Sequence, residues 1–403
     1  MKYSTIAVAA SSALLALASP IVRDSTPGVI SLPINHQYGP GISLANRKRE
    51  TPEGYSLTNE FFGYYATIEI GTPGQKNQVG IDTGSSDLWV YGPSSGAATE
   101  YDSAQSSTYS YNNSDFSIEY VLGSASGIWA TDVVSWGSVT VDSQSFGINN
   151  ADGKNSAGVF GIGYISEESS QAKKISYINF PQNLVDQGFI AHNAYSLYLD
   201  DVNAGSGAIL FGGVDSDKYT GQLYTVPVTS PDSFEVTVSD ITYNGKTIAG
   251  GSFSGILDSG TSYTYLPNTQ FQSLINALGA TYVRVKSKAL SDNGGYFLKK
   301  LPSSGVTYSF SGATVTVPPS ELAIPLSDLG LRVSGYEYFV PIYSIKDSSG
   351  YVLLGDSFLR SAYVVYDLDN KEISIAQSSF DSTNSNIQAI TDSVPGAKPA
   401  PQI

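Results

Sequence analysis

The chain has no cysteine and only two histidines, His36 and His192, among its 403 residues. Without cysteine it can form neither a disulfide bond nor a thiolate metal site. No group of histidines and carboxylates has the spacing typical of a metal site. No glycine-rich loop is followed by the lysine and hydroxyl residue that bind a phosphate. We therefore expect neither a metal ion nor another cofactor.

Basic residues are scarce: 21 lysines and arginines stand against 36 acidic residues, a net charge of −15. Residues 1–49 hold five basic residues and one acid, a net +4, which leaves −19 for residues 50–403. A surface this negative repels nucleic acid and anionic membranes, so we expect neither as a partner. Because the chain has few basic residues, it avoids strong positive self-repulsion when its carboxylates protonate in acid. This would suit work at low pH, but simple solubility explains the charge imbalance equally well.

Long apolar runs are also missing, and one short run lies at the N-terminus. Lys2 precedes an apolar stretch from about Ile6 to Leu17, which is followed by Ala18 and Ser19. The stretch is too short to span a bilayer stably. With a small residue before the expected cleavage point, it is typical of a secretory signal peptide. We expect residues 1–18 to be removed and the protein to be secreted to the extracellular space.

Residues 19–49 are rich in proline, glycine and serine and end in Arg47, Lys48 and Arg49. An exposed dibasic pair at this place, just before regular β pattern begins, is typical of a processing site. We predict that residues 19–49 are a pro-peptide cut after Lys48 and Arg49, either by a dibasic-specific protease or by the protein itself in acid. The mature chain would then begin at Glu50.

What the chain does contain is glycine, 40 residues, and short apolar segments separated by turns from Gly63 onward. Such segments are typical of β-strands, and helical patterns are confined to about Asn183–Gln187 and Asn268–Leu278. We predict a mainly β protein with too many strands for one small sandwich. The polar, proline-containing residues 381–403 should form a flexible tail.

One short sequence occurs twice. Residues 82–86 read Asp-Thr-Gly-Ser-Ser, residues 258–262 read Asp-Ser-Gly-Thr-Ser, and an apolar strand pattern precedes each copy. Each copy is later followed by two apolar residues and a glycine. Two similar halves that each supply one aspartate indicate a bilobal protein with a pseudo-two-fold axis. We place the lobes at residues 50–225 and 226–380.

An aspartate on a tight glycine turn can point into a cleft while neighbouring hydroxyl groups bond its oxygens. Asp82 and Asp258, held about 3 Å apart, could not both ionise cheaply and would share one proton. One carboxyl would act as the base on a water molecule, and the other would donate its proton to the carbonyl oxygen of a peptide bond. The residues expected to support the two carboxyls, by close backbone approach or by hydroxyl bonds, are Thr83, Gly84, Ser85, Ser259, Gly260 and Thr261.

With these features the chain resembles the pepsin family of aspartic proteases, and most closely its secreted yeast and fungal members. The resemblance covers about residues 60–380. It implies a pepsin-like fold of two β-rich lobes with a substrate cleft between them, an extended polypeptide as substrate, and an aspartate pair that shares a proton, as is known for this family. Besides the two aspartate loops, it rests on Phe62–Tyr65, Gly71–Pro73, Gly158–Gly163, Phe211–Asp215 and Leu353–Arg360.

The family carries a β-hairpin flap with a tyrosine over its cleft, and residues 117–127 match that hairpin. By this resemblance Tyr120 is the flap tyrosine, Gly123 and Ser124 belong to the flap, and Trp89 is the hydrogen-bond partner of Tyr120. Tyr120 is otherwise one of 28 tyrosines, and its sequence neighbours are what favour the flap role.

Several features depart from the family pattern. Disulfides are usual there, whereas this chain can form none. Val121 and Leu122 make the flap tip more apolar. Gly80 stands where a larger apolar residue often lines the main specificity pocket, and we hypothesise that it enlarges that pocket. The predicted pro-peptide has no lysine between Ser19 and Asn46, so the usual latch of a pro-segment lysine on the two aspartates has no counterpart.

Three other interpretations were weighed. Residues 92–96 match the serine-hydrolase elbow pattern, but a triad needs a histidine; His36 lies in the predicted pro-peptide, and His192 is better explained as a surface or loop residue, so we interpret the segment as a turn. A glycosidase also uses two carboxylates, but nothing outside the pair suggests sugar binding. A non-catalytic peptide-binding protein on the same fold would be expected to lose an aspartate or Tyr120.

Asn112 begins the sequence Asn-Asn-Ser, a glycosylation sequon in a polar turn. We therefore expect a candidate glycan at Asn112, and a secreted monomer that acts on polypeptides.

Overall fold

The computed structural model describes residues 28–38, 62–120, 123–153, 156–169, 177–285, 290, 294–347 and 351–401. In this part of the chain strands far outnumber helices, which confirms the mainly β prediction. The predicted signal peptide at 1–18, the processing residues Lys48 and Arg49, and the hairpin tip at Val121 and Leu122 lie outside the described residues.

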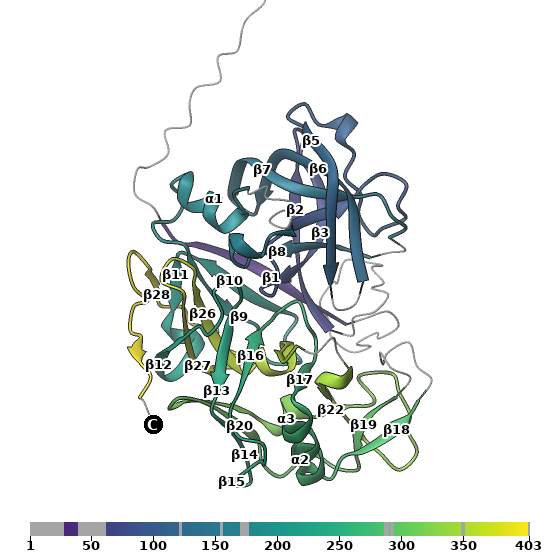
Figure 1. The fold of residues 1–403 in the computed structure, drawn as a ribbon, viewed down its shortest axis with the longest axis vertical. Helices are drawn as coiled ribbons and strands as arrows, with labels where there is room; N and C mark the ends of the chain where they lie inside the picture. The colour runs from purple at the N-terminus through teal and green to yellow at the C-terminus, as the bar shows by residue number, and fades with distance from the viewer. Residues whose placement is uncertain are drawn as a thin grey trace, which may run out of the picture.

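One sheet of 14 strands joins the first half of the chain, drawn above in Figure 1, to the second half below. Three of its strands come from the second half: β26 pairs with β9, and β27 and β29 pair with β12. The lobe boundary drawn at 225/226 falls inside β12. In sheet order the strands are β29 (Lys398–Pro399), β12 (Tyr219–Pro227), β27 (Glu372–Ser378), β26 (Ala362–Asp367), β9 (Ala194–Tyr198), β10 (Ser206–Phe211), β1 (Ile30–Tyr38), β2 (Phe62–Ile70), β3 (Gln75–Asp82), β8 (Gly158–Gly161), β4 (Leu88–Tyr91), β7 (Val139–Asn149), β6 (Gly123–Trp136) and β5 (Ser110–Tyr120).

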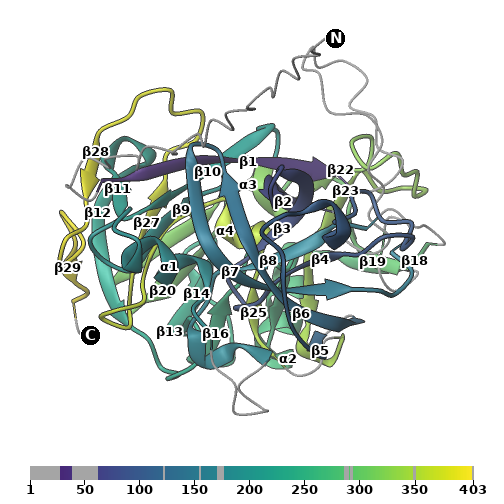
Figure 2. The same ribbon diagram turned by 90° about the horizontal axis from the view of Figure 1, so that it is seen from above.

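Strand β1 belongs to the predicted pro-peptide, yet it lies in the middle of this sheet. Figure 2 shows it, in purple, running across the top of the molecule beside β10. It pairs antiparallel with β10 on one side and with β2 on the other. Its inward residues alternate, as a half-buried strand requires: Leu32, Ile34 and His36 are buried, whereas Pro33 and Asn35 are exposed. This segment is therefore part of the folded protein in the form described.

The second half contributes three further sheets, and the five-stranded one contains β16, the strand that runs into Asp258. The sheets are, in strand order, β13 (Glu235–Val238), β16 (Phe253–Leu257), β25 (Leu353–Leu354), β17 (Thr264–Leu266) and β24 (Ile342–Ser344); β15 (Lys246–Thr247), β14 (Asp240–Tyr243), β20 (Val306–Phe310) and β21 (Ala313–Val317); and β18 (Thr281–Arg284), β19 (Gly294–Leu298), β23 (Tyr338–Val340) and β22 (Ile324–Pro325).

The repeat seen in the sequence is also a repeat of strand pairing. In the first half β3 runs into Asp82 and pairs parallel with β8, which pairs antiparallel with β4, and β4 pairs parallel with β7. In the second half β16 runs into Asp258 and pairs parallel with β25, which pairs antiparallel with β17, and β17 pairs parallel with β24. The apolar-apolar-glycine element after each copy is thus the strand that supports its aspartate loop.

Helices are short and few among the described residues. One of them overlaps the expected segment Asn183–Gln187 but begins three residues earlier, and another coincides with Asn268–Leu278. The helices are α1 (Phe180–Asp186), α2 (Asn268–Leu278), α3 (Pro319–Leu322) and α4 (Asp356–Leu359). Asn179 caps α1 by accepting a hydrogen bond from the Gln182 N–H. Gly279, in the left-handed conformation with a φ of 72°, ends α2.

The C-terminal segment is packed against the fold, and the prediction of a flexible tail from residue 381 is wrong for the described residues up to 401. Strand β28 (Ile387–Ala389) pairs with β11 (Gly213–Asp215), and β29 pairs with β12. Ile390 is fully buried, and the Asp215 carboxylate accepts hydrogen bonds from Ser385 and Asn386. Isolated apolar residues in a polar segment gave no sequence pattern for this docking.

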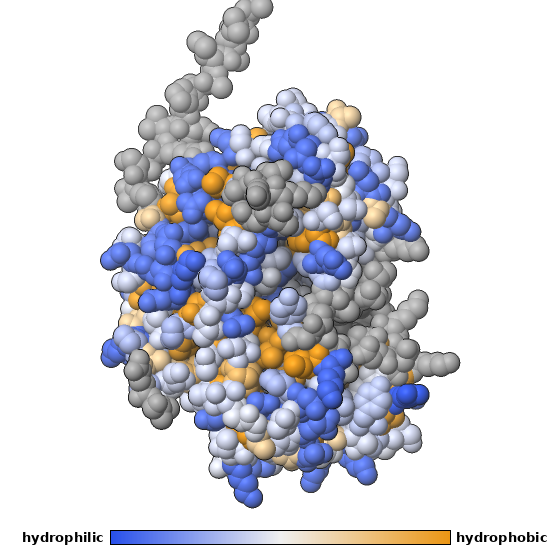
Figure 3. Space-filling model, in the orientation of Figure 1, coloured by the Kyte–Doolittle hydropathy of each residue, from blue (hydrophilic) through white to orange (hydrophobic). Residues whose placement is uncertain are grey.

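Hydrophilic residues cover most of the face in Figure 3, and apolar residues show mainly along its middle. None of the helices in the described part of the chain is long and apolar enough to cross a membrane.

Candidate active site

The two aspartates lie in loops with the same hydrogen bonds. At the end of β3, the Asp82 carboxylate accepts a hydrogen bond from the Gly84 N–H at 2.8 Å and one from the Ser85 hydroxyl at 2.5 Å. After β16, the Asp258 carboxylate accepts from the Gly260 N–H at 2.8 Å and from the Thr261 hydroxyl at 2.5 Å. Each loop therefore fixes its carboxylate through one backbone donor and one hydroxyl donor.

The residues between each aspartate and its glycine tie the two loops together. The Thr83 N–H donates to the Ser259 Oγ at 3.1 Å, and the Ser259 N–H donates to the Thr83 Oγ1 at 2.9 Å. Each hydroxyl also donates to the opposite loop, Thr83 to the Leu257 carbonyl and Ser259 to the Ile81 carbonyl, both at 2.8 Å. Four buried hydrogen bonds thus fix one loop relative to the other.

Glycine allows the two carboxyls to meet. A Cβ atom built at Gly84 would lie 2.5 Å from an Asp258 oxygen, and one built at Gly260 would lie 2.4 Å from an Asp82 oxygen. Each carboxyl therefore lies against the glycine of the opposite loop, in space that any larger residue would fill. The two carboxyls are hydrogen-bonded to each other. Both aspartates are 8% exposed.

Burial raises the pKa of both carboxyls, because it penalises the charged form. The pKa of Asp82 is raised further by the nearby charge of Asp258, whereas the hydrogen bond from Asp82 lowers the pKa of Asp258. The pair consequently keeps one proton where an isolated aspartate would be ionised, and the two carboxyls share it. Such a pair contains an acid and a base within one hydrogen bond.

The predicted hairpin is formed by β5 and β6, and it reaches the first loop. Tyr120, at the end of β5, pairs with Gly123, and Glu119 pairs with Ser124. The Trp89 Nε1–H donates to the Tyr120 hydroxyl oxygen at 2.8 Å. Burial, followed by the charge of Asp82, raises the pKa of Tyr120 well above its usual value, so its hydroxyl is neutral and lies within electrostatic range of the pair.

Comparison with known proteins decides between the interpretations. Residues 63–378 match the family described as "Eukaryotic aspartyl protease". The chain belongs to the eukaryotic aspartyl protease family. This confirms the resemblance found in the sequence and sets aside the serine-hydrolase and glycosidase interpretations.

Relatives cover nearly the whole of this aspartyl protease. It is 38% identical to "Probable aspartic-type endopeptidase opsB" of Aspergillus oryzae, over 93% of this chain and 82% of that one. It is 35% identical to "Candidapepsin-3" of Candida albicans, over 97% and 100%. The crystal structure of the aspartic proteinase from Irpex lacteus superimposes with a TM-score of 0.70 at 24% identity, covering 89% and 100%, which confirms the bilobal pepsin-like fold. The protein is an aspartic-type endopeptidase.

Two tyrosines beneath the aspartates were not predicted as site residues. Tyr195 on β9 and Tyr366 on β26 are cross-strand partners, and their rings stack with centroids 5.0 Å apart. The Tyr195 hydroxyl donates to the Ile162 carbonyl at 3.0 Å, and the Tyr366 hydroxyl donates to the Leu257 carbonyl at 3.4 Å. Each hydroxyl supports a segment that holds one aspartate. Nothing local distinguishes these two among 28 tyrosines.

Glu167 is a third carboxyl near the pair, and the sequence analysis missed it. It ends a short 3-10 helix, η2 (Ile165–Glu167), beyond the first loop. Burial, with repulsion from Asp82 and then from Asp232 and Asp258, raises the pKa of Glu167 to about 9. Glu167 is therefore neutral in the folded protein at neutral pH.

Replacing Glu167 by glutamine is expected to stabilise the protein at pH 7 but not at pH 4. In the unfolded chain the carboxyl ionises above a pKa of 4.5, whereas in the folded protein it stays protonated up to about 9. The unfolded state therefore binds fewer protons between these values, and stability falls as pH rises through them. Glutamine removes this loss, about 2–3 kcal/mol at pH 7. Urea unfolding at both pH values measures the difference.

Glu69→Gln, on the exposed side of β2, is the matched control, and it should change stability little at either pH. Equal effects of Glu167→Gln at pH 4 and pH 7 would contradict the assignment of Glu167 as a protonated, partly buried carboxyl.

Gly80 on β3 pairs with Tyr65 on β2, and a Cβ atom built at Gly80 would lie 3.4 Å from Tyr65 Cε1. The ring of Tyr65 thus bounds the space that a larger side chain at position 80 would enter. We expect Gly80→Ala to be tolerated, because its Cβ makes ordinary van der Waals contact. Gly80→Ile should displace the Tyr65 ring and cost about 1–3 kcal/mol of stability. Thermal and urea unfolding of both variants measure this. Equal stabilities of the two variants would contradict the prediction, because they would mean that the Tyr65 ring moves aside without cost.

The remaining predicted residues lie outside this constellation. Asn112 is exposed on β5, and its amide donates to the Thr131 hydroxyl at 2.9 Å. His192 lies in a loop, one of the two expected placements, and it is buried, with its Nε2 2.8 Å from the Asp367 carboxylate. In the elbow-like segment the Ser95 hydroxyl donates to Glu100 at 3.0 Å, which agrees with its interpretation as a turn.

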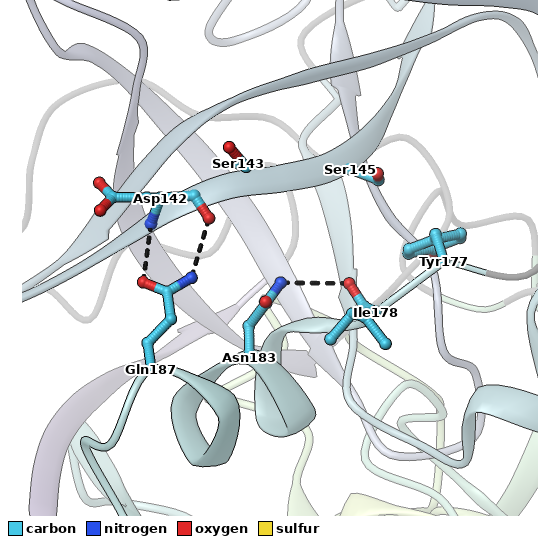
Figure 4. A pocket seen from close by; sticks show the side chains of 7 residues that line it. All are labelled: Asp142, Ser143, Ser145, Tyr177, Ile178, Asn183 and Gln187. Atoms are coloured by element: carbon cyan, nitrogen blue, oxygen red, sulfur yellow. Dashed lines mark hydrogen bonds between the residues drawn. The ribbon is translucent and has the colours of Figure 1, made fainter.

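A polar hollow lies between β7 and α1, and neither aspartate lines it (Figure 4). The Gln187 side-chain amide accepts a hydrogen bond from the Asp142 N–H and donates one to the Asp142 carbonyl, and the Asn183 amide donates to the Ile178 carbonyl. Both side-chain amides in the hollow are therefore already hydrogen-bonded within the protein. Its lining residues are Asp142, Ser143, Ser145, Tyr177, Ile178, Asn183 and Gln187. We assign no function to this hollow.

Proposed function

We propose that Asp82 and Asp258 form the catalytic pair that hydrolyses peptide bonds in polypeptide substrates. The observation that carries the proposal is the matched arrangement of the two loops: two hydrogen-bonded, buried carboxyls, each held by one backbone N–H and one hydroxyl group. This arrangement suits a reaction in which one carboxyl gives a proton while the other takes one.

In this mechanism the ionised carboxyl of the pair acts as general base and removes a proton from a water molecule lying between Asp82 and Asp258. The protonated carboxyl donates its proton to the carbonyl oxygen of the peptide bond as the water oxygen attacks the carbonyl carbon. The tetrahedral intermediate carries no bond to the enzyme. The base then passes its proton to the leaving nitrogen and the C–N bond breaks. As the product carboxyl group forms, one hydroxyl of the intermediate returns a proton to the other aspartate, which restores the pair with one proton.

The hairpin supplies a second part of the proposal. Tyr120, held by Trp89, would close over a bound polypeptide together with Gly123 and Ser124, which are exposed beside it. The neutral hydroxyl of Tyr120 is suited to donate a hydrogen bond in the neighbourhood of Asp82. The enlarged pocket hypothesised at Gly80 would bear on substrate preference, with Tyr65 as one wall.

We further propose that the protein is secreted as a zymogen and acts as a monomer, with cleavage after Lys48 and Arg49 by a dibasic-specific protease or by itself. The charge contrast between residues 1–49 and the rest supports this, as does the relative named "Secreted aspartic protease 3" from Candida albicans. Amino-terminal sequencing of secreted protein tests it, with Glu50 as the expected first residue and a start well away from Glu50 as the contrary result.

Cleavage of a denatured protein substrate is expected to be fastest in acid and to disappear towards neutral pH. The pair is active with one proton bound. It loses that proton as pH rises above the raised upper pKa of the pair, which leaves two carboxylates and no acid. Initial rates between pH 2 and pH 8 give the profile. Binding of a peptide without cleavage at any pH would favour the non-catalytic alternative, and activity that keeps rising to pH 8 would exclude the proposed pair.

A further inference from the structure

Strand β1 contains one inward-facing side chain that can change its charge. Leu32, Ile34 and His36 face the interior, and His36 is 6% exposed. The strand contacts β10 through Ile30–Asn35 and β2 through Asn35–Tyr38, so His36 lies in the part held by β2. The predicted processing point after Arg49 lies downstream, so a cut there would leave β1 attached to the enzyme only by non-covalent contacts.

The surroundings of His36 suit a neutral ring. Its ring stacks on that of Tyr64, its cross-strand partner on β2, with centroids 4.8 Å apart and an interplanar angle of 11°. Its Nδ1 lies 3.2 Å from the Ala204 carbonyl oxygen, and its backbone N–H donates to the Gly205 carbonyl at 3.1 Å. Aromatic stacking and one carbonyl contact hold the ring without requiring it to carry a charge.

Within the described part of the chain, Arg360 supplies a positive charge that acts on His36. Arg360, which follows α4, is fully buried, and its guanidinium repels a protonated His36. Glu321 of α3 faces Arg360, with its Oε2 2.5 Å from Arg360 Nε, and Asp356 of α4 also acts on Arg360. The hydroxyl of Tyr64, whose ring stacks on His36, bonds the Leu199 carbonyl at 3.1 Å. The carboxylate of Glu321 is thus already used by Arg360.

We propose that His36 is a pH-sensitive element that weakens the docking of β1 in acid and so favours release of the pro-peptide from the enzyme. Protonation places a second positive charge in a buried site beside Arg360, and the strand relieves this by leaving. The inference rests on the proposed pro-peptide, but it is independent of the proposed catalytic pair.

Burial and the charge of Arg360 lower the pKa of His36 from 6.5 to about 3, against the opposing effect of the Ala204 carbonyl. A released strand has the ordinary value and binds a proton below pH 6.5, whereas the docked strand does not do so until about pH 3. Docking is therefore at full strength above pH 6.5 and is lost as pH falls towards 3. The docking constant should fall about thirtyfold by pH 5 and about 300-fold by pH 4.

Hydrogen exchange of the full chain tests this directly. The parent should carry Asp82→Asn, which prevents self-cleavage during the measurement. Protection of the amides of Ile30–Tyr38, corrected for the chemical exchange rate, should fall about thirtyfold between pH 7 and pH 5. Strands β20 and β21, which lie in another sheet, serve as the internal reference and should change little. Because no proteolysis is measured, failure of the proposed catalytic pair would not affect the result.

Two variants isolate the histidine. His36→Phe keeps an aromatic ring against Tyr64 without a titratable nitrogen, and His36→Asn keeps a donor for the Ala204 carbonyl. Both should abolish the excess loss of protection in β1 at pH 5. The same pH dependence in either folded variant, or unchanged β1 protection in the parent, would overturn the proposal.

An NMR titration of the parent gives a second reading, because the chain has only two histidines to assign. A His36 that stays neutral at pH 5 while β1 is docked supports the proposal. A His36 that titrates near pH 6.5 with β1 still protected overturns it, even if neither variant folds.

Discussion

Replacement of Asp82 by asparagine is expected to lower kcat/KM for peptide cleavage by about 10⁴-fold, the upper end of what general acid–base catalysis contributes. The amide has the shape of the carboxyl, but Gly84 and Ser85 donate to different oxygens of Asp82, so the single amide oxygen can accept only one of these two hydrogen bonds. It can neither hold the shared proton nor release it to a substrate. Initial rates at the acidic optimum, with the same substrate and pH for both proteins, measure the loss.

The matched variant is Asp258→Asn, which should lose activity to a similar extent because the two carboxyls act as a unit. The double variant should then be little worse than either single one. Thermal unfolding provides the control for folding: the variants remove a buried carboxyl that repels its neighbour, so neither should melt below the parent at neutral pH. An Asp82→Asn enzyme that keeps a tenth of the parent kcat/KM would contradict the assignment.

The aspartate loops could be predicted because their information is local. Asp, a hydroxyl residue, Gly and a second hydroxyl residue follow one another within four positions, and the repetition of this order 176 residues later indicated two halves. The bonds between Thr83 and Ser259 follow from the same short sequences once the halves are taken as symmetric. The helices at 180–186 and 268–278 were likewise indicated by local pattern.

The features that sequence reasoning missed depend on distant partners. The alternation of Leu32, Ile34 and His36 was present, but only β2 and β10 make that segment a central strand. Tyr366 supports the Leu257 carbonyl 109 positions away. His192 is buried because Asp367 binds it, 175 positions away. In each case the role of a common residue depends on a contact with a distant residue, which the neighbouring sequence does not indicate.

The buried ion pair of Arg360 and Glu321 is the site where loss of one partner should cost most stability. Arg360 is 0% exposed and Glu321 1% exposed. Glu321 holds the Arg360 Nε through one carboxylate oxygen and accepts from the Val202 N–H at 2.8 Å through the other. Replacing Glu321 by alanine would leave a buried guanidinium without this carboxylate. We expect the free energy of unfolding to fall by about 3–5 kcal/mol, measured by urea unfolding at pH 6.

The double variant Glu321→Leu/Arg360→Met separates the cost of an uncompensated charge from the worth of the pair. Two apolar side chains of similar volume leave no buried charge, so its stability should return to near that of the parent or exceed it. It should also affect β1. Without Arg360, one of the two causes that lower the pKa of His36 is gone. The docked and released pKa values then move closer together, so β1 should lose less protection between pH 7 and pH 4 than in the parent. A double variant as unstable as Glu321→Ala, or one with unchanged pH dependence of β1, would show that the pair acts through its geometry and not through its charge.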